Sequence, residues 1–437
     1  MIALLPTQRL ALCLVTIATM AALIAVSHIF LIVTLLASAL LVASLIADLA
    51  LGPISVPIEI GRRHPVKLEQ MTPSAVPYTI SSKLAAWLDL DLVDNHDTCL
   101  TMNPDPIHAR LQPLVETNVP VVWTGTVRGD VHLGRLDAAV RNMLGLLERR
   151  YRFELPAVIS IVPRRAVLQA GSLTTRNRSL NAGLRSLRRP GVGSEFEGLR
   201  SYVPGDPFRM IHWKTTARRG SLTVIERQVE RAQHVILAFD CGRLMSGRID
   251  QRSKLDYTLE AGLALSRVGL VADDRVGAYA FADTERAWVA PRSGRTHHRR
   301  IVDACYDLQP VPRESDYERA AATLQRRLSK RSLVVLFSDI FDPDTTLETL
   351  GAFRTLTASN LVLVVLMNDS ALEAAVATAP RDRRSALRTG VALALLDERR
   401  RALARLRAEI DVLDVAPTEL AARTIDKYLA IKATGRL

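Results

Sequence analysis

The sequence lacks most of the residue patterns that mark metal centres and active sites. Its four cysteines, Cys13, Cys99, Cys241 and Cys305, form neither a CxxC pair nor another metal-binding spacing, and no zinc motif is present. The GxxxxGK[ST] phosphate loop is absent, so we do not expect the chain to hydrolyse ATP itself. The nine histidines offer no catalytic set, and the run RTHHRR at Arg295–Arg300 is predicted to be a basic surface loop.

Charged side chains are absent from one long part of the chain, the 38 residues Leu10–Ala47. A single helix of this length would measure about 57 Å at about 1.5 Å per residue. One bilayer crossing needs only about 30 Å. We therefore predict two transmembrane helices, about Leu10–Val26 and Ile29–Asp48, joined by a turn at Ser27-His28.

The cations that flank this hairpin predict its orientation. Arg9 precedes the uncharged run, Arg62 and Arg63 follow it, and the turn contains no cation. The positive-inside rule then places both termini and the later domains in the cytoplasm. The competing interpretation is a cleaved signal peptide with Leu10–Val26 as its apolar region, and the unbroken second apolar run argues against it.

Length and charge set limits on the rest of the chain. The 437 residues are enough for two or three domains, and 48% of them are hydrophobic, which provides for sizeable cores. The formal net charge of +12 is compatible with a nucleic acid, an anionic membrane face or an acidic protein as a partner. The uncharged N-terminal run favours the membrane face.

Short apolar runs separated by proline and asparagine follow the predicted hairpin domain, residues 1–52. Ile54–Ile60 alternates apolar and other residues, Val119–Val127 repeats apolar side chains at even spacings, and Ala157–Val162 is a compact apolar run. Short strands bounded by turn signals predict an Ig-like β-sandwich over residues 53–165.

A polar, arginine-rich stretch, Gly171–Pro190, comes next. It has no aromatic residue and no periodicity, so we interpret it as a solvated linker at the start of a linker-and-signature region, residues 166–232. Contacts between its arginines and phosphate groups are the alternative.

Strand and helix patterns alternate in the last part of the chain, residues 233–437. This alternation predicts a doubly wound α/β domain with a mostly parallel sheet. The predicted strands are His234–Phe239, Arg275–Phe281, Leu333–Phe337, Leu361–Leu366 and Asp411–Val415. The predicted helices are Leu255–Val268, Tyr317–Ser329, Leu347–Leu356 and Glu419–Ile431.

The stretch Gly193–Glu226 combines turn formers, aromatics, cations and acids more densely than any other part of the chain. Its turn residues argue against a helix and its pattern shows no sustained alternation, so an irregular surface segment is predicted. The order of its residues resembles the signature of a bacterial family known as domain of unknown function 58. The positions that carry the resemblance are Glu195, Phe196, Gly198, Arg200, Tyr202, Gly205, Asp206, Arg209, Ile211, Trp213, Lys214, Ala217 and Arg218. A weaker match, with two departures, lies at Asn142–Leu146.

The resemblance implies a multi-domain fold: a transmembrane α-hairpin, a β-sandwich and a von Willebrand A-like, Rossmann-type α/β domain. Some domains of that class hold a divalent ion with an Asp-x-Ser-x-Ser motif, a later hydroxyl and a second aspartate. Here Gly242 and Leu244 replace both serines after Asp240, while Ser315 and Asp339 match the later positions. We therefore expect a degenerate site without a cofactor, Mg²⁺ remaining the alternative. Asp240 is expected to cap the following turn and to pair with Arg243 or with an arginine of the signature.

The resemblance also implies an interaction role beside AAA+ ATPases of the MoxR type. The first hypothesis is therefore a non-enzymatic, membrane-anchored adaptor or assembly factor. Arginine and tryptophan are common hot-spot residues, so the predicted docking residues are Glu195, Phe196, Arg200, Tyr202, Gly205, Asp206, Arg209, His212, Trp213, Lys214 and Arg218. In the structural alternative, Trp213 packs on a sheet edge and Arg200 or Arg209 pairs with Glu195 or Asp206.

Two further hypotheses belong to other classes of protein. A divalent-metal-dependent, membrane-bound hydrolase or transferase would use Asp240 and Asp339, and the missing serines argue against it. A nucleic-acid binder would use the positive charge, but the chain contains no recognised module that reads nucleic acid. Lipid bilayer and a protein partner are the expected contacts.

Overall fold

The structure, a computed structural model, divides into two compact units, Met1–Arg164 and Arg165–Leu437. It describes residues 3–22, 28–51, 58–83, 87–142, 144–164, 195–204, 206–228, 233–339, 351–368 and 370–434. Several predicted features lie outside the described residues in whole or in part. They include the linker 171–190, the end of the helix predicted at 10–26 with the turn residue Ser27, the start of the strand predicted at 54–60, the signature residue Gly205 and the first residues of the helix predicted at 347–356.

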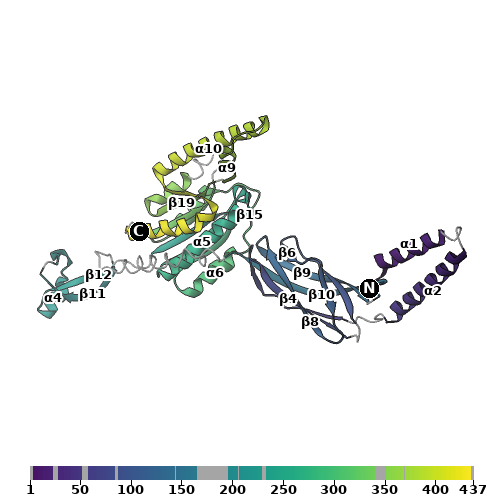
Figure 1. The fold of residues 1–437 in the computed structure, drawn as a ribbon. Helices are drawn as coiled ribbons and strands as arrows, with labels where there is room; N and C mark the ends of the chain where they lie inside the picture. The colour runs from purple at the N-terminus through teal and green to yellow at the C-terminus, as the bar shows by residue number, and fades with distance from the viewer. Residues whose placement is uncertain are drawn as a thin grey trace. The chain divides into compact units, whose positions relative to one another are not determined.

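Two apolar helices form the N-terminal part of the first unit (Figure 1). Helix α1 covers Gln8–Ala22 and helix α2 covers His28–Leu51. Within α2, the 21 residues Phe30–Ala50 are long and apolar enough to cross a membrane, whereas α1 is a shorter apolar helix of 15 residues. The two predicted helices are therefore present, and one of them has the length of a membrane span.

Both ends of this helical pair are attached to one turn of the adjoining β-domain. The N-terminal strand β1 (Ala3–Pro6) pairs antiparallel with the start of β10 (Leu147–Val162). Asp48, which is 1% exposed near the end of α2, accepts a hydrogen bond of 2.8 Å from the backbone N–H of Leu147. Arg149 of the same strand donates to backbone carbonyl oxygens at the end of α2, where a cation is favoured. The helices are thus fixed to the β-domain by backbone pairing and by buried charge.

Two sheets share one hydrophobic core in the rest of this unit. Their remaining strands are β2 (Ile58–Arg62), β3 (Lys67–Glu69), β4 (Ser74–Ser82), β5 (Leu88–Asp94), β6 (Leu100–Asn103), β7 (Ile107–Leu111), β8 (Glu116–Gly125) and β9 (Gly129–Asn142). The larger sheet has the order β1-β10-β9-β5-β7 with β3 beside β10, and the smaller has the order β2-β4-β8-β6. Tyr78 and Trp123 of the smaller sheet and Leu136 of the larger one are fully buried in this core. Two sheets around one core fit the predicted β-sandwich.

Arg62, one of the cations used to orient the hairpin, belongs to the interior of this domain. Its side chain is 3% exposed and lies 2.5 Å from Asp94. Asp94 also accepts a hydrogen bond of 2.6 Å from the hydroxyl of Tyr78. Burial, followed by the charge of Asp94, raises the pKa of Tyr78 and keeps its hydroxyl protonated. Of the two arginines used to orient the hairpin on this side, Arg63 is the exposed one.

The second unit contains a six-stranded sheet covered by helices on both faces. Its strands are β13 (His234–Asp240), β16 (Arg275–Phe281), β17 (Glu285–Arg292), β18 (Ser332–Phe337), β19 (Leu361–Met367) and β20 (Asp411–Val415). Its helices are α5 (Lys254–Val271), α6 (Arg295–Cys305), α7 (Tyr317–Arg327), α9 (Ser370–Ala377), α10 (Arg383–Glu409) and α11 (Leu420–Ala433). Shorter elements are η4 (Arg243–Ser246), β14 (Arg248–Ile249), β15 (Arg252–Ser253), η5 (Thr355–Ala358) and η6 (Pro417–Glu419).

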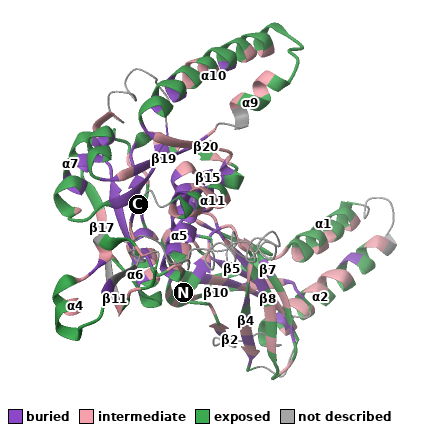
Figure 2. Cartoon of the chain, turned by 90° about the vertical axis from the view of Figure 1, so that its left-hand side faces the viewer, coloured by how far each residue is buried: buried purple, intermediate pink, exposed green. Residues whose placement is uncertain are grey.

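The strand order in this sheet is β17-β16-β13-β18-β19-β20, and every pair is parallel except β16 with β17. Residues of β13 alternate between two cores. Leu237 and Phe239 pack with α5 and α11, whereas Ile236 and Ala238 pack with α7 and α10. Figure 2 shows these strands as the buried centre of the unit, with most of α10 exposed. The predicted strand–helix alternation is confirmed, and β16 and β20 have the predicted bounds.

The prediction of a basic loop at RTHHRR is wrong. These residues form the first half of α6. His297 is 4% exposed, and its Nε2 lies 2.9 Å from the carbonyl oxygen of Val276. Ile301 and Cys305, four and eight residues further on, are also buried on this helix. The run was misjudged because its cations hide the i, i+4 spacing of a helix with one buried side.

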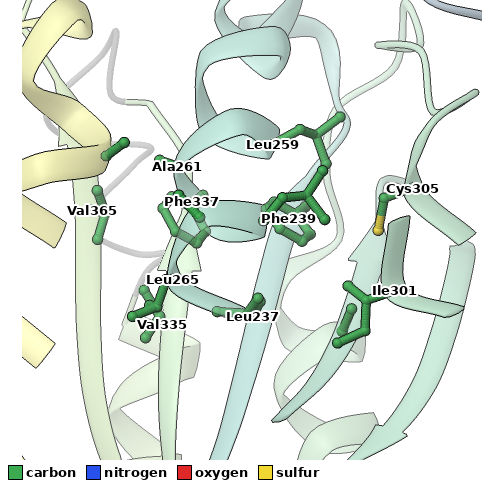
Figure 3. Close-up of a cluster of buried hydrophobic side chains, with 14 of the residues drawn as sticks. Leu237, Phe239, Leu259, Ala261, Leu265, Ile301, Cys305, Val335, Phe337 and Val365 are labelled. Atoms are coloured by element: carbon green, nitrogen blue, oxygen red, sulfur yellow. The ribbon is translucent and has the colours of Figure 1, made fainter. Parts of the chain in front are cut away.

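The contact between α5 and the sheet yields a first prediction. Figure 3 shows Phe239 and Phe337 beneath this helix, and their rings stack with centroids 5.2 Å apart. A Cβ at Gly262 would collide with the ring of Phe239, whereas Gly390 of α10 has open space around it. Gly262→Ala should destabilise the chain by about 1–3 kcal/mol through overpacking. Gly390→Ala should stabilise it by about 0.5–1 kcal/mol, because alanine is the better helix residue. Chemical unfolding of the full chain in detergent measures both, and equal effects of the two changes would contradict this packing.

Candidate interaction site and the carboxyl edge of the sheet

The signature residues form a small hairpin module rather than an irregular segment. Strands β11 (Glu195–Ser201) and β12 (Thr223–Gln228) pair antiparallel, and between them lie η3 (Phe208–Met210) and helix α4 (Trp213–Arg219). The prediction that this stretch contains no helix is therefore wrong. Pro204, Gly205, Asp206 and Pro207 all precede η3, and α4 itself contains neither proline nor glycine.

The ends of α4 carry ordinary helix-terminating signals. His212 is the N-cap residue, and its Nδ1 lies 3.3 Å from the backbone nitrogen of Thr215. Gly220 ends the helix with φ 67°, a conformation that favours glycine. Ile211 and Val224, which flank the helix on either side, are 6% and 1% exposed and give the module its small core. His212, predicted as a docking residue, therefore has a structural role in starting α4.

Three signature residues brace the turn that precedes η3. The guanidinium of Arg200 donates two hydrogen bonds to Asp206, at 2.7 and 2.6 Å. Asp206 also accepts from the backbone N–H of Val203 at 2.9 Å. The hydrogen bonds from Arg200, and next that of Val203, lower the pKa of the Asp206 carboxyl. Tyr202 stacks on Phe208 with ring centroids 6.1 Å apart. Internal pairing of Arg200 with Asp206, one of the two alternatives, is confirmed.

Trp213 does not pack on a sheet edge. Its exposed fraction is 65%, and that of Phe208 is 71%. Lys214 and Arg218 are also exposed on α4 and lie four residues apart, so their side chains are neighbours. We call Phe208, Trp213, Lys214 and Arg218 the α4 surface. Two predicted residues, Glu195 and Phe196, lie in β11, and Arg209 lies in η3.

Asp240 ends β13 at the carboxyl edge of the large sheet and is 1% exposed. One carboxylate oxygen accepts from the backbone N–H of Gly242 at 2.8 Å and from the hydroxyl of Ser315. The other accepts from Tyr317 at 2.5 Å and from Ser338 at 2.7 Å. Burial, followed by the charge of Asp240, raises the pKa of Tyr317 well above its usual value, so this hydroxyl stays a donor. The carboxylate thus has four protein donors.

The predicted turn cap by Asp240 is confirmed, and the predicted pairing with Arg243 is wrong. Arg243 lies 3.0 Å from Glu314 in an exposed ion pair. The loss of the first serine of the motif has a steric reason, because a Cβ at Gly242 would collide with the hydroxyl of Ser315. The hydroxyl of Ser315 therefore occupies the space that the side chain of the missing serine would fill.

Asp339 lies two residues beyond the end of β18 and is neutralised by two cations. The Nζ of Lys254, the first residue of α5, binds one carboxylate oxygen, and Arg399 of α10 lies 3.2 Å from the other. Arg399 also binds Asp414 at 2.9 Å and the carbonyl oxygen of Met367 at 2.6 Å. The side chains of Asp339 and Arg399 are 4% and 11% exposed. Strand ends β18, β19 and β20 are therefore joined through one guanidinium.

The carboxylate oxygens of Asp240 and Asp339 do not form a binding site that fits a divalent ion. Hard cations need several carboxylate or hydroxyl oxygens that are free to coordinate. Here hydrogen-bond donors saturate Asp240, and lysine and arginine neutralise Asp339. In the described part of the chain, no group of three or more His, Cys, Asp or Glu side chains is arranged to hold a metal.

Comparison with known proteins places the second unit in a family context. Residues 198–381 match the family model described as "Protein of unknown function DUF58", which confirms the resemblance seen in the signature. The uncharacterized protein Mb1516 of Mycobacterium bovis is 26% identical over 182 residues, which are 41% of this chain and 56% of that protein. The uncharacterized protein YeaD of Bacillus subtilis is 30% identical over 115 residues, 26% of this chain and 28% of that protein. The chain thus matches little more than half the length of these relatives at most.

Two solved structures are similar to nearly half of the chain. The conserved hypothetical protein BatB from Bacteroides thetaiotaomicron has 14% identity and a TM-score of 0.29, over 46% of this chain and 100% of that one. An aerotolerance-related membrane protein from Bacteroides fragilis has the same identity and TM-score, over 46% of this chain and 99% of that one. Neither similarity assigns an activity to this chain.

Because protein groups already occupy the carboxyl edge of the sheet, we predict that Mg²⁺ leaves the melting temperature unchanged. A ligand that binds only the native state would instead raise the free energy of unfolding by about 2.7 kcal/mol at 100 times its Kd. Lys254→Met should cost about 3 kcal/mol, because it removes a cation from the buried Asp339 carboxylate. The control Arg243→Met removes an exposed cation and should cost at most about 1 kcal/mol. Melting of the full chain with and without millimolar Mg²⁺ tests all three. A rise in melting temperature with Mg²⁺ that Asp240→Ala abolishes would show that the edge does bind an ion.

Proposed function

We propose that this protein is a non-enzymatic, membrane-anchored adaptor or assembly factor that works with a MoxR-type AAA+ ATPase. The observation that carries the proposal is the α4 surface, where Trp213 and Phe208 remain mostly exposed on a module whose turn is braced by Arg200 and Asp206. Large exposed apolar patches that are rimmed by polar residues mark interaction sites on soluble proteins. In this role the ATPase supplies the energy, and this chain supplies the location and the docking surface.

A protein partner fits this surface better than the other classes. Tryptophan and arginine are enriched among residues that dominate binding free energy at protein interfaces. Elsewhere in the α/β unit, many exposed arginines are engaged with carboxylates, for example Arg327 with Glu285 at 2.9 Å and Arg401 with Asp397 at 3.1 Å. These pairs interrupt the positive surface of the unit, which argues against a continuous track for nucleic acid.

The hydrolase alternative has less support. General-base or metal-assisted chemistry would need a carboxylate that can accept a proton or coordinate an ion. Asp240 already accepts four hydrogen bonds, and Asp339 is bound by Lys254 and Arg399.

We propose a von Willebrand A-like identity for the α/β unit. When the strands of its six-stranded sheet are numbered in chain order, the sheet has the order 3-2-1-4-5-6 of doubly wound sheets. Its two acidic residues of interest, Asp240 and Asp339, follow neighbouring parallel strands at the carboxyl edge. Open α/β sheets bind their ligands at that edge. In this chain, cations and hydroxyl groups of the protein itself bind both aspartates there.

The proposed location is the bacterial inner membrane, with both helices spanning it and the soluble domains in the cytoplasm. Attachment of both helix ends to the same turn, through β1 and Asp48, supports a hairpin that enters and leaves the membrane on one side. Arg9 and Arg63 on that side support a cytoplasmic orientation.

The docking proposal predicts that Trp213→Ala weakens capture of a MoxR-type ATPase about thirtyfold, the effect of losing roughly 2 kcal/mol at a hot spot. Melting of the variant should stay within about 0.5 kcal/mol of the parent chain, because the side chain is exposed. Leu387→Ala is the matched control, an apolar residue of α10 that is 64% exposed. Surface-immobilised full chain in detergent, titrated with the ATPase, measures the affinity. Unchanged capture by a folded Trp213→Ala chain would remove the docking role, and salt-sensitive DNA binding lost in that variant would favour a nucleic-acid partner.

The membrane proposal predicts opposite signals from two reporter fusions. A reporter active only outside the cytoplasm should be silent at the C-terminus and active when inserted at Ser27-His28. Alkaline phosphatase activity in intact cells measures both. The reverse pair of signals would place the soluble domains outside, and silence at both positions would show that the helices do not cross.

A further inference from the structure

A charged cavity of about 920 Å³ lies in the first unit, at the base of the helical pair. Its wall is formed by the end of β1, the first residues of α1 and parts of β5, β7, β9 and β10. The charged residues of the wall are four arginines and three acids: Arg9, Arg110, Arg141, Arg150, Asp89, Asp91 and Glu148. The sequence interpretation did not find this site, because its residues come from strands and a helix far apart in the chain.

The acids of this wall are all engaged by wall cations. Asp91 binds Arg141 and lies 2.6 Å from the Nδ1 of His108. Glu148 binds Arg150 at 2.8 Å, and Asp89 lies 3.8 Å from Arg110. The carboxylates are therefore neutralised within the cavity.

Arg9 gives the wall its excess positive charge. Among the described residues it makes no ion pair, and its nearest polar partner is the carbonyl oxygen of Leu144 at 3.5 Å. It lies over Gly145, which has φ 63° and where a Cβ would be 2.9 Å from the guanidinium. Two further residues of the wall, Thr7 and Gln8, lie at the N-terminal end of the 15-residue helix α1, which begins at Gln8. Anions are favoured at this end of a helix.

The cavity lies next to the start of α1 and the end of α2, the two apolar helices. The apolar helix α1 starts at its wall, and α2 ends beside it, where Asp48 binds the backbone N–H groups that follow Gly145. The candidate span Phe30–Ala50 ends at this same point of the chain. Groups at the ends of a membrane span lie at the depth of the lipid head groups.

We propose that this cavity binds a phosphate group, supplied by the head group of an anionic phospholipid. Arginine guanidinium groups bind phosphate oxygens through paired, charge-assisted hydrogen bonds. The volume falls in the usual range for small-molecule sites, about 300–1,000 Å³. The head group would sit between Arg9 of the helical pair and Arg110 and Arg150 of the sandwich, and would fix the β-domain against the membrane face. This inference is independent of the docking role of the α4 surface.

A matched pair of double variants tests the site. Arg110→Gln with Arg150→Gln removes two wall cations whose side chains are 67% and 61% exposed. Arg135→Gln with Arg152→Gln removes two exposed cations outside the wall, both near Asp137 at 3.7 and 3.0 Å. Each pair loses the same charge and two surface ion pairs, which are worth about 0–1 kcal/mol each. Both variants are therefore expected to fold.

The measurement is the shift in melting temperature of the full chain in detergent on titration with short-chain phosphatidylglycerol, with short-chain phosphatidylcholine and with inorganic phosphate. Phosphatidylglycerol should stabilise the parent chain and the outside variant, with an affinity at least about tenfold weaker in the wall variant. A shift with inorganic phosphate alone, lost in the wall variant, would support the phosphate site and assign it a soluble ligand. No shift in the parent chain, or equal shifts in all three proteins, would overturn the proposal.

Two single variants replace this comparison if the wall double variant does not fold. Arg150 and Arg152 lie two residues apart on β10, and each substitution, Arg150→Gln or Arg152→Gln, removes one ion pair with a nearby acid. The weaker response to phosphatidylglycerol should appear only in Arg150→Gln. Equal responses of these two variants would overturn the site. The reporter fusions at the C-terminus and at Ser27-His28 are unaffected by either outcome, so a failure here is distinguishable from a failure of the membrane topology.

Discussion

The ion pairs around Asp339 are the interaction on which the α/β unit depends most. Lys254 brings the start of α5 to this carboxylate, and Arg399 brings α10 to it, while the same guanidinium reaches β19 and β20. The start of α5, helix α10 and the ends of strands β18, β19 and β20 therefore meet at one buried cluster of charge. Such a cluster stabilises the fold only while every member is present, because removal of one partner leaves a buried charge uncompensated. The cluster also occupies the part of the sheet where open α/β domains otherwise bind ligands.

Because the carboxyl edge of the sheet is occupied by the chain's own groups, the surface that we propose to be functional lies elsewhere, on the signature module. At the edge, Asp240 has its four donors and Asp339 its two cations, so the chain itself supplies what an ion would supply. In the signature module the arrangement is the opposite, since Arg200 and Asp206 satisfy one another internally while Trp213 and Phe208 remain exposed. A rigid module with exposed aromatics suits binding, and a saturated carboxyl edge does not suit catalysis.

The sequence was sufficient where one physical signal dominated. The apolar runs of β16 and β20 gave the right bounds, and the placement of Asp240 and Asp339 at strand ends was correct because each lies within two residues of an apolar run. The prediction failed where two signals competed. Cations concealed the buried side of α6, and turn residues before η3 concealed helix α4. The partners of Asp339 and the cavity beside Arg9 could not be predicted, because both depend on contacts between residues more than 50 positions apart.

The most direct test of the account is a photocrosslink formed in living cells. A benzophenone amino acid would be placed at position 213 of the α4 surface or at position 387 of α10, two sites of nearly equal exposure in the structure, at 65% and 64%. The account predicts a covalent adduct with a MoxR-type ATPase from position 213 and none from position 387. Adducts of equal yield from both positions, or from position 387 alone, would contradict the claim that the signature module is the docking surface.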